Sequence, residues 1–155
     1  MLEGHGALNR TLEDLSRELS GEARDHARRV SVYAAATAVQ LKLPDDMVLA
    51  VRVAAELHEA GQFPSELASE TAKWFAHPWN GAGAGPPVGK DIPIGARVLS
   101  AAHEFDLLTM PPRTNTVVAQ QAALEYLELE GGRRFDPAVV TAFKKVQRVI
   151  QPLGL

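Results

Sequence analysis

Three of the five histidines lie in segments with a helical apolar pattern, and each has a carboxylate nearby in the sequence. They are His26, His58 and His103, and the acids beside the first two include Glu22 and Glu59. A spacing of four places Glu22 and His26 on one face of a helix, within reach of a shared ion. Imidazole nitrogens and carboxylate oxygens are ligands of zinc, iron and manganese, so together these residues indicate a metal site. Each histidine alone is more often a surface residue, or a core residue with one hydrogen bond.

The elements that must position these residues are helices. Apolar residues recur at spacings of three and four nearly throughout, and no segment shows the sustained alternation of a strand. The expected helices cover approximately residues 22–41, 45–60, 66–75, 94–109, 116–130 and 136–151. A further helix is expected in residues 1–20, where Leu12, Leu15 and Leu19 form a stripe that could pack on the domain or dimerise. The sequence therefore predicts an all-α fold with a helical domain of six or seven helices in residues 21–155.

Local signals fix where several of these helices begin and end. Gly61 is a suitable C-terminal cap, so His58 and Glu59 are expected at the end of a helix. Asp136 followed by Pro137 predicts a helix start, with the carboxylate as cap. Thr37 falls on an apolar stripe, where its hydroxyl is expected to bond back to a helix carbonyl.

Residues 76–93 differ from the rest because glycine and proline dominate them. This composition predicts a loop. Its glycine spacing superficially suggests phosphate binding, but no strand precedes it, and Asp91 follows Lys90 where a P-loop has serine or threonine.

Composition excludes several classes of function. The chain of 155 residues has a net charge of −3, so it offers no broad electrostatic attraction to nucleic acid or anionic membranes. The absence of cysteine excludes disulfides, thiolate metal sites and a cysteine nucleophile. No stretch is long and apolar enough for a membrane span, and the first residues show no secretory signal. A cytoplasmic location is therefore expected.

Five segments together resemble a known family. They are "DHARRV" (25–30), "AAELHEAGQ" (54–62), "WNGAG" (79–83), "DIPIGARVLSAAHEFDLLT" (91–109) and "GGRRFDPAVVTAF" (131–143). In residue type and order they are similar to the HD-GYP subfamily of the HD superfamily, a group of cyclic-di-GMP phosphodiesterases. The interval between the second and third segments is, however, shorter than in that family and lacks a helical segment that carries a further histidine. The resemblance covers about residues 22–145. It implies a single HD-domain-like helical bundle and a centre of two or three metal ions that activates water against a phosphodiester.

The chain departs from this family where its chemistry should lie. Glu59 stands for the aspartate of the HD pair, Gln62 for the lysine that would steady a phosphate, and His103 for a metal-binding aspartate. Phe75-Ala76-His77 replaces the family's HHE, and the tyrosine and proline of GYP are absent. The side chain of Glu59 is one methylene longer than aspartate, which a carboxylate bridging two metals tolerates poorly.

The ligands that survive these changes suffice for one ion. The resemblance leaves Glu22, His26, His58, Glu59 and His103 as metal ligands, with the alignment of His77 uncertain by one or two positions. This set suits one divalent zinc, iron or manganese ion and is too small for a multinuclear centre. Asp106 and Arg113 align near positions where the family contacts its nucleotide, which makes them candidate nucleotide-binding residues.

The leading functional hypothesis is a degenerate HD-GYP-like domain. Glu59 and Gln62 would be remnant catalytic positions, cyclic-di-GMP hydrolysis would be lost, and the domain would act in signalling through a protein partner or a homodimer. One alternative is a divergent phosphohydrolase with a mononuclear metal site. Another is a sensor that binds a cyclic dinucleotide without turning it over.

Overall fold

The computed structural model describes residues 17, 21–110 and 117–150, and within these it is all-helical. The α-helices are α2 (Gly21–Gln40), α3 (Asp45–Leu57), α4 (Glu66–Trp74), α5 (Ile94–Thr109), α6 (Val117–Leu129) and α7 (Pro137–Ile150), and a 3-10 helix covers Gly89–Asp91. The all-α prediction is thus confirmed for the described part of the chain. The expected N-terminal helix with Leu12, Leu15 and Leu19 lies outside the described residues.

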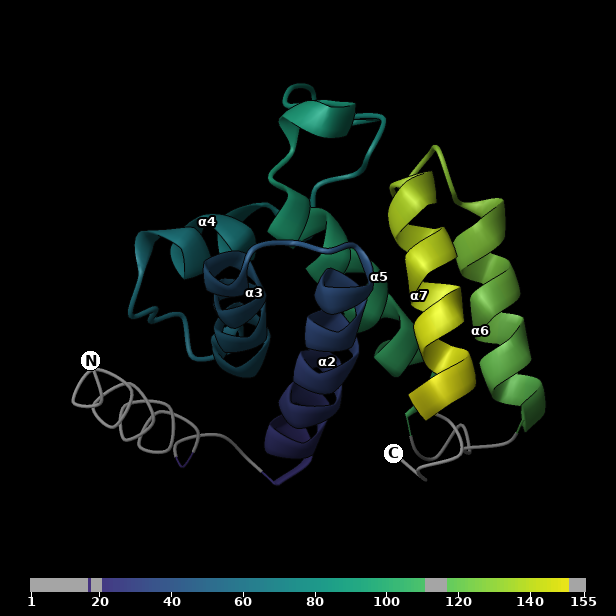
Figure 1. Cartoon of the computed structure of the whole chain (residues 1–155). Helices are drawn as coiled ribbons and strands as arrows, with labels where there is room; N and C mark the ends of the chain where they lie inside the picture. Colours follow the sequence, from purple (N-terminus) through teal and green to yellow (C-terminus); the bar gives the residue numbers. More distant parts are fainter. Residues whose placement is uncertain (1–16, 18–20, 111–116, 151–155) are drawn as a thin grey trace.

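Helix α2 occupies the middle of the bundle (Figure 1). It packs most extensively on α3 and also contacts α5 and α7. Helix α5 contacts every other described α-helix, namely α2, α3, α4, α6 and α7. Chain segments far apart in sequence therefore meet around α2 and α5.

An aromatic cluster fixes the contact between α2, α5 and α7. The ring centroids of Tyr33 and Phe105 are 5.4 Å apart, and those of Phe105 and Phe143 are 5.0 Å apart, in edge-to-face arrangements. All three side chains are buried. Such pairs stabilise by roughly 0.5–1.5 kcal/mol beyond the burial of their area. The cluster therefore holds the middle of α5 at a defined depth against α2.

Close approach of backbones also positions α5. Gly95 lies in its first turn, where an added Cβ would stand 2.7 Å from the Thr71 hydroxyl oxygen and 3.0 Å from a Val51 methyl. Only glycine lets α5 begin this close to α3 and α4 without a shift of these neighbours.

The helix ends follow the sequence signals. The backbone N–H of Ala138 donates to the Asp136 carboxylate at 2.9 Å, so Asp136 caps α7 as predicted. The Thr37 hydroxyl donates to the Tyr33 carbonyl at 2.7 Å, as expected for a threonine on a buried stripe. Helix α3 ends slightly earlier than expected, and Gly61 takes a positive φ of 72° in the turn that follows.

The glycine- and proline-rich stretch forms turns apart from its short 3-10 helix, as its composition predicts. It is anchored at both its start and its middle. The backbone N–H groups of Trp79 and Asn80 donate to the carbonyls of Arg134 and Arg133. The His77 Nε2 lies 2.9 Å from the Gly85 carbonyl and 2.8 Å from the Pro87 carbonyl.

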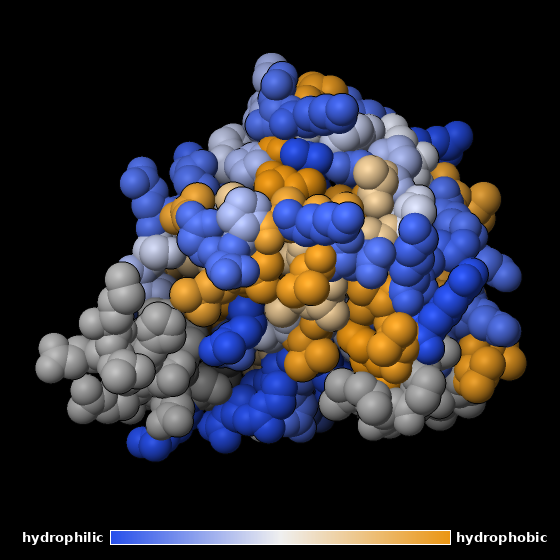
Figure 2. All heavy atoms as spheres, in the orientation of Figure 1, coloured by the Kyte–Doolittle hydropathy of each residue, from blue (hydrophilic) through white to orange (hydrophobic). Residues whose placement is uncertain are grey.

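Hydrophilic residues cover much of the face in Figure 2, and apolar residues gather between them. None of the described helices has both the length and the hydrophobicity needed to cross a bilayer.

Candidate metal centre

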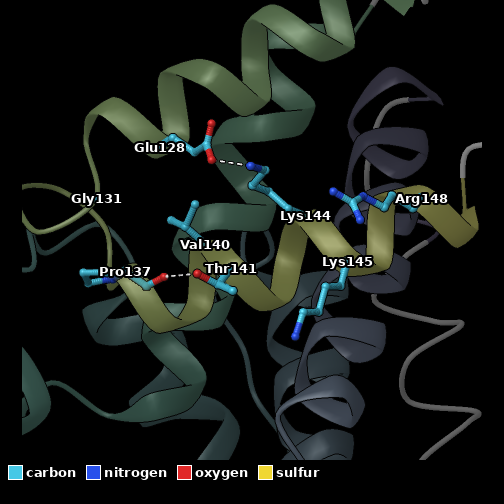
Figure 3. A pocket seen from close by; sticks show the side chains of 8 residues that line it. All are labelled: Glu128, Gly131, Pro137, Val140, Thr141, Lys144, Lys145 and Arg148. Atoms are coloured by element: carbon cyan, nitrogen blue, oxygen red, sulfur yellow. Dashed lines mark hydrogen bonds and ion pairs between the residues drawn. The ribbon is translucent and has the colours of Figure 1, made fainter.

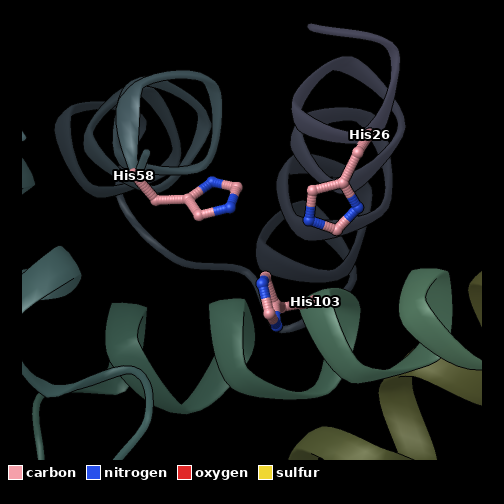
Figure 4. Close-up of side chains that lie close together, drawn as sticks. All are labelled: His26, His58 and His103. Carbon is pink, nitrogen blue, oxygen red and sulfur yellow. The ribbon is translucent and has the colours of Figure 1, made fainter. Parts of the chain in front are cut away.

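Three helices each bring one imidazole to a common cluster. His26 lies near the start of α2, His58 directly follows α3, and His103 lies in the second half of α5. The ring centroids are 5.0, 5.1 and 5.3 Å apart, and Figure 4 shows the three rings turned toward one space. One ring nitrogen from each lies within 4.8 Å of the other two.

The orientation of His26 is set by a buried carboxylate on α5. Its Nδ1 lies 2.6 Å from Asp106 Oδ2. The same carboxylate accepts two bonds from Arg29, at 2.7 Å from Nε and 3.0 Å from Nη2. Burial alone would raise the pKa of Asp106, but these hydrogen bonds outweigh burial and hold the pKa below its ordinary value. Because an ionised carboxylate only accepts, the proton of His26 resides on Nδ1.

A backbone carbonyl sets the orientation of His58. Its Nδ1 lies 2.6 Å from the Ala55 carbonyl oxygen, which only accepts, so Nδ1 carries the proton here as well. The end of α3 makes this bond possible, since His58 reaches back to a carbonyl of the last turn.

In a neutral imidazole, a proton on Nδ1 leaves Nε2 as the nitrogen with a free lone pair. The Nε2 atoms of His26 and His58 are buried and have no hydrogen-bond partner among the described residues. A buried acceptor without a donor costs about 1–3 kcal/mol. Zinc bonds of about 2.0–2.1 Å place ligand nitrogens roughly 3.3 Å apart, so small side-chain rotations would bring the group onto one ion. The three histidines therefore fit a single metal ion of the kind that imidazole ligates.

The electrostatics of the cluster favour the neutral imidazole at His58 and His103. Burial lowers the pKa of His58, and the neighbouring His26 lowers it further. Burial lowers the pKa of His103 to about 4, with His58 and His26 adding to the shift. A neutral imidazole is the form that binds metal, so at neutral pH ligation requires no loss of a proton from His103.

The lowered pKa of His103 predicts an acid-sensitive fold for the metal-free protein. The unfolded chain binds a proton near pH 6.5 and the folded chain only near pH 4, so His103 reduces the free energy of unfolding as pH falls through this range. The slope from this residue is at most about 1.4 kcal/mol per pH unit, and less because the ring is partly exposed. Urea denaturation of His103→Gln should show a flatter pH dependence between 6.5 and 4. An unchanged slope would contradict the assigned burial effect.

Other predicted ligands lie outside the group of three. The side chain of Glu59 is 41% exposed, and its Oε1 is 3.8 Å from His58 Nε2, so it borders the cluster without joining it. Glu22 is exposed, and so is Gln62, which the sequence marks as a remnant catalytic position and not as a ligand. His77 is held by loop carbonyls. Ligation by Glu22 or Glu59 stays a prediction.

Of the predicted nucleotide contacts, Arg113 lies outside the described residues and Asp106 is buried. Only 1% of Asp106 is exposed, and both its oxygens are bonded to Arg29 and His26. A nucleotide contact stays a prediction for Asp106, whereas its hydrogen bonds make it a positioning residue for His26.

Sequence reasoning missed the pairing of α2 and α5 through Arg29 and Asp106. A signal was present, because His26 and Arg29 are three apart on α2, and His103 and Asp106 are three apart on α5. It also missed the contact of Phe75, whose ring centroid is 5.9 Å from that of His58 and 5.1 Å from that of His103. An apolar ring thus borders the cluster on one side.

Comparison with known families matches one part of the chain. The HD domain family model matches residues 75–139, which include His103 and Asp106. The match supports membership of the HD superfamily. HD domains typically bind divalent metal ions, and the matched stretch carries the α5 part of the centre, whereas His26 and His58 precede it. No curated protein matches the chain.

Proposed function

We propose that this chain is a degenerate HD-GYP-like domain with a mononuclear three-histidine metal centre, and that it acts in signalling through a protein partner or a homodimer. The observation that carries the proposal is the convergence of His26, His58 and His103, in which two buried Nε2 atoms have no hydrogen-bond partner within residues 21–110 and 117–150. Among the described residues, no carboxylate belongs to this group. A multinuclear phosphodiesterase centre depends on bridging carboxylates, so this set supports one ion rather than two.

The surroundings of the cluster support the loss of cyclic-di-GMP hydrolysis. Where the HD-GYP resemblance calls for further ligands, Phe75 places an apolar ring against His58 and His103. Gln62 is exposed and supplies no positive charge to a phosphate. The carboxylate of Glu59 stands at the solvent side of the cluster.

A metal ion here would join three helices that are separate in sequence. Bound at the three imidazoles, it would link α2, the end of α3 and α5. Because a ligand that binds only the folded state stabilises it, metal occupancy would control how firmly these helices are held together. This coupling is the physical basis for a regulatory role.

The proposal predicts no turnover of cyclic di-GMP by the metal-loaded protein. Chromatographic detection of linear dinucleotide or GMP should show no more product with wild-type protein than with His58→Ala. Product formation at ordinary enzyme rates in the wild type, lost in His58→Ala, would overturn it. Calorimetric titration with cyclic di-GMP in the same samples distinguishes a sensor that binds without turnover from a domain that does not bind it.

A mononuclear phosphohydrolase is the second candidate, and one observation favours it. Three protein ligands leave coordination positions open, as in catalytic zinc sites. His103 also lines a pocket of about 210 Å³. When bound, the ion would supply Lewis-acid activation of a phosphoester. This candidate fails if the purified protein holds no metal and recruits none on dialysis.

A further inference from the structure

Helices α6 and α7 lie side by side and antiparallel at one side of the bundle, joined by residues 130–136 (Figure 1). Their charges have opposite signs. Helix α6 has two acidic residues and no basic one, whereas α7 has three basic residues and no acidic one. A groove of about 360 Å³ between the helices is lined by Glu128 of α6 and by Lys145 and Arg148 of α7. The acidic and the basic side chains therefore share one face of the molecule.

The exposed residues on this face follow the same spacing on both helices. Each helix exposes two charges of one sign three residues apart, followed directly by an apolar residue. These are Glu125, Glu128 and Leu129 on α6, and Lys145, Arg148 and Val149 on α7. The spacing i, i+3 and i+4 places each set on one face of its helix, and we call the sets the α6 ridge and the α7 ridge. Leu129 is 76% exposed and Val149 is 68% exposed, so both can enter an interface.

The charges of the α7 ridge are not neutralised within the chain. Figure 3 shows Lys144 paired with Glu128, whereas Lys145 points away from this pair. In the part of the chain that the structure describes, neither Lys145 nor Arg148 forms an ion pair. A partner of one charge would match one ridge and be repelled by the other, because the two ridges flank one groove. A second copy of this chain carries both ridges and so matches both.

We propose that two copies of this chain form a dimer through this face, with the α6 ridge of each copy on the α7 ridge of the other. Two-fold dimers are the commonest soluble oligomers, and a two-fold axis through the face lays α6 of one copy along α7 of the other. Because α6 and α7 are antiparallel within a chain, this rotation makes the paired helices run in the same direction and brings their last turns together.

The register of the two ridges supports this arrangement. Their equal spacing matches an acid to a base at two positions and a leucine to a valine at the third, and the symmetry makes each contact twice. The pairs are Glu125 with Lys145, Glu128 with Arg148, and Leu129 with Val149. Opposite potentials that meet in this way fix the register and disfavour other partners. The contact of Glu128 with Lys144 can persist, since a carboxylate accepts from more than one donor.

The inference rests on the proposed function, which leaves open whether the partner is another protein or a second copy, and it selects the second copy. The ridges lie on α6 and α7, whereas the candidate metal ligands lie on α2, directly after α3 and on α5. No residue of either ridge belongs to the three-histidine group. Dimerisation and metal binding can therefore be measured separately on one sample.

The experiment is sedimentation analysis of the full-length protein from about 1 to 100 µM, a range that reports micromolar dissociation constants. Wild type should be dimeric at the upper end. Glu125→Lys and Lys145→Glu should each raise the dissociation constant about 10- to 100-fold, because each replaces attraction by repulsion at both symmetric contacts. An equal mixture of the two variants should associate nearly as wild type does. In the mixed dimer both contacts again join opposite charges, so this recovery excludes misfolding as the cause of the loss.

Two exposed positions away from the face supply matched controls. Glu70→Lys on α4 makes the same charge change as Glu125→Lys and should associate as wild type does. Leu129→Gln should weaken the dimer about 10-fold, because it removes an apolar contact from both symmetric positions. Val39→Gln is its control, since Val39 is 62% exposed near the end of α2 and lies outside both ridges.

The outcomes separate this inference from the proposed function. Wild type that stays monomeric at about 100 µM overturns the dimer, with or without metal. A wild-type dimer that neither charge reversal weakens, or a mixture that stays dissociated, overturns the pairing of the ridges. Equal weakening by Glu70→Lys also overturns it, because general charge would then explain the association. Elemental analysis of the same samples tests the metal centre, since a dimer without metal contradicts only that centre and a monomer with metal contradicts only this inference.

Discussion

Purified, untagged wild-type protein is expected to hold about one equivalent of a divalent transition metal, and His58→Ala is expected to hold none. The Nε2 atoms of His26 and His58 are buried and have no hydrogen-bond partner in the part of the chain that the structure describes, so the folded chain brings free ligand nitrogens together. Removing His58 leaves two imidazoles, below the three protein ligands that mononuclear catalytic sites use. Elemental analysis by mass spectrometry measures the outcome directly and identifies the metal.

Metal addition should also raise the melting temperature of wild type. At a free metal concentration about 100 times Kd, linkage contributes about 2.7 kcal/mol, which corresponds to a rise of about 5–10 °C for a domain of this size. His58→Ala and His103→Ala should show no rise. His77→Ala is the matched control, because this histidine is bonded to loop carbonyls outside the group and should leave the metal response intact.

Two results would contradict the metal site. The first is wild type without metal and without a thermal response to zinc, iron or manganese, which would make the three rings a core cluster whose nitrogens bond buried water. The second is equal metal content in wild type and both His58→Ala and His103→Ala, which would place the ion elsewhere. Using two variants on different helices guards against a loss caused only by misfolding of one of them.

The fold was predictable because its signals are local. Apolar spacing, the Asp136 cap and the Gly61 turn act within a few residues, and the structure confirms helices close to the expected positions. The candidate metal ligands His26, His58 and His103 were also identified from sequence, and they converge. Their convergence depends on packing of α2, α3 and α5, which a pattern along one segment does not specify.

The finer features of the site depend on distances between helices. Whether Glu59 joins the ligands depends on the end of α3, where its side chain is 41% exposed and its Oε1 lies 3.8 Å from His58 Nε2. The sequence predicts Asp106 as a nucleotide contact. In the folded chain the packing of α5 against α2 buries this carboxylate, and it is hydrogen-bonded to His26. None of these outcomes follows from residue type alone.

Asp106→Asn is expected to impair both stability and metal binding. The carboxylate neutralises Arg29 and fixes the tautomer of His26, and an amide loses the charge and half the accepting capacity. Breaking a buried ion pair typically costs about 3–5 kcal/mol, and losing a carboxylate behind a ligating histidine costs about 10- to 100-fold in metal affinity. Urea denaturation of the metal-free protein and competition against a chromogenic chelator measure these two effects separately.

Asp136→Asn separates the positioning role from general destabilisation. Asp136 is also a buried carboxylate with an arginine partner, since it accepts from Arg97 at 2.6 Å, but it does not touch the histidines. This variant should lose stability yet keep wild-type metal affinity.

The pKa of Asp106 is lowered, so its stabilising contribution is present above about pH 3.8, its ordinary value, and disappears as pH falls through its folded pKa. Asp106→Asn should therefore differ from wild type at pH 7 and approach it in strong acid. If Asp106→Asn keeps full metal affinity, the carboxylate only holds α2 to α5, and His26 needs no partner to bind the ion.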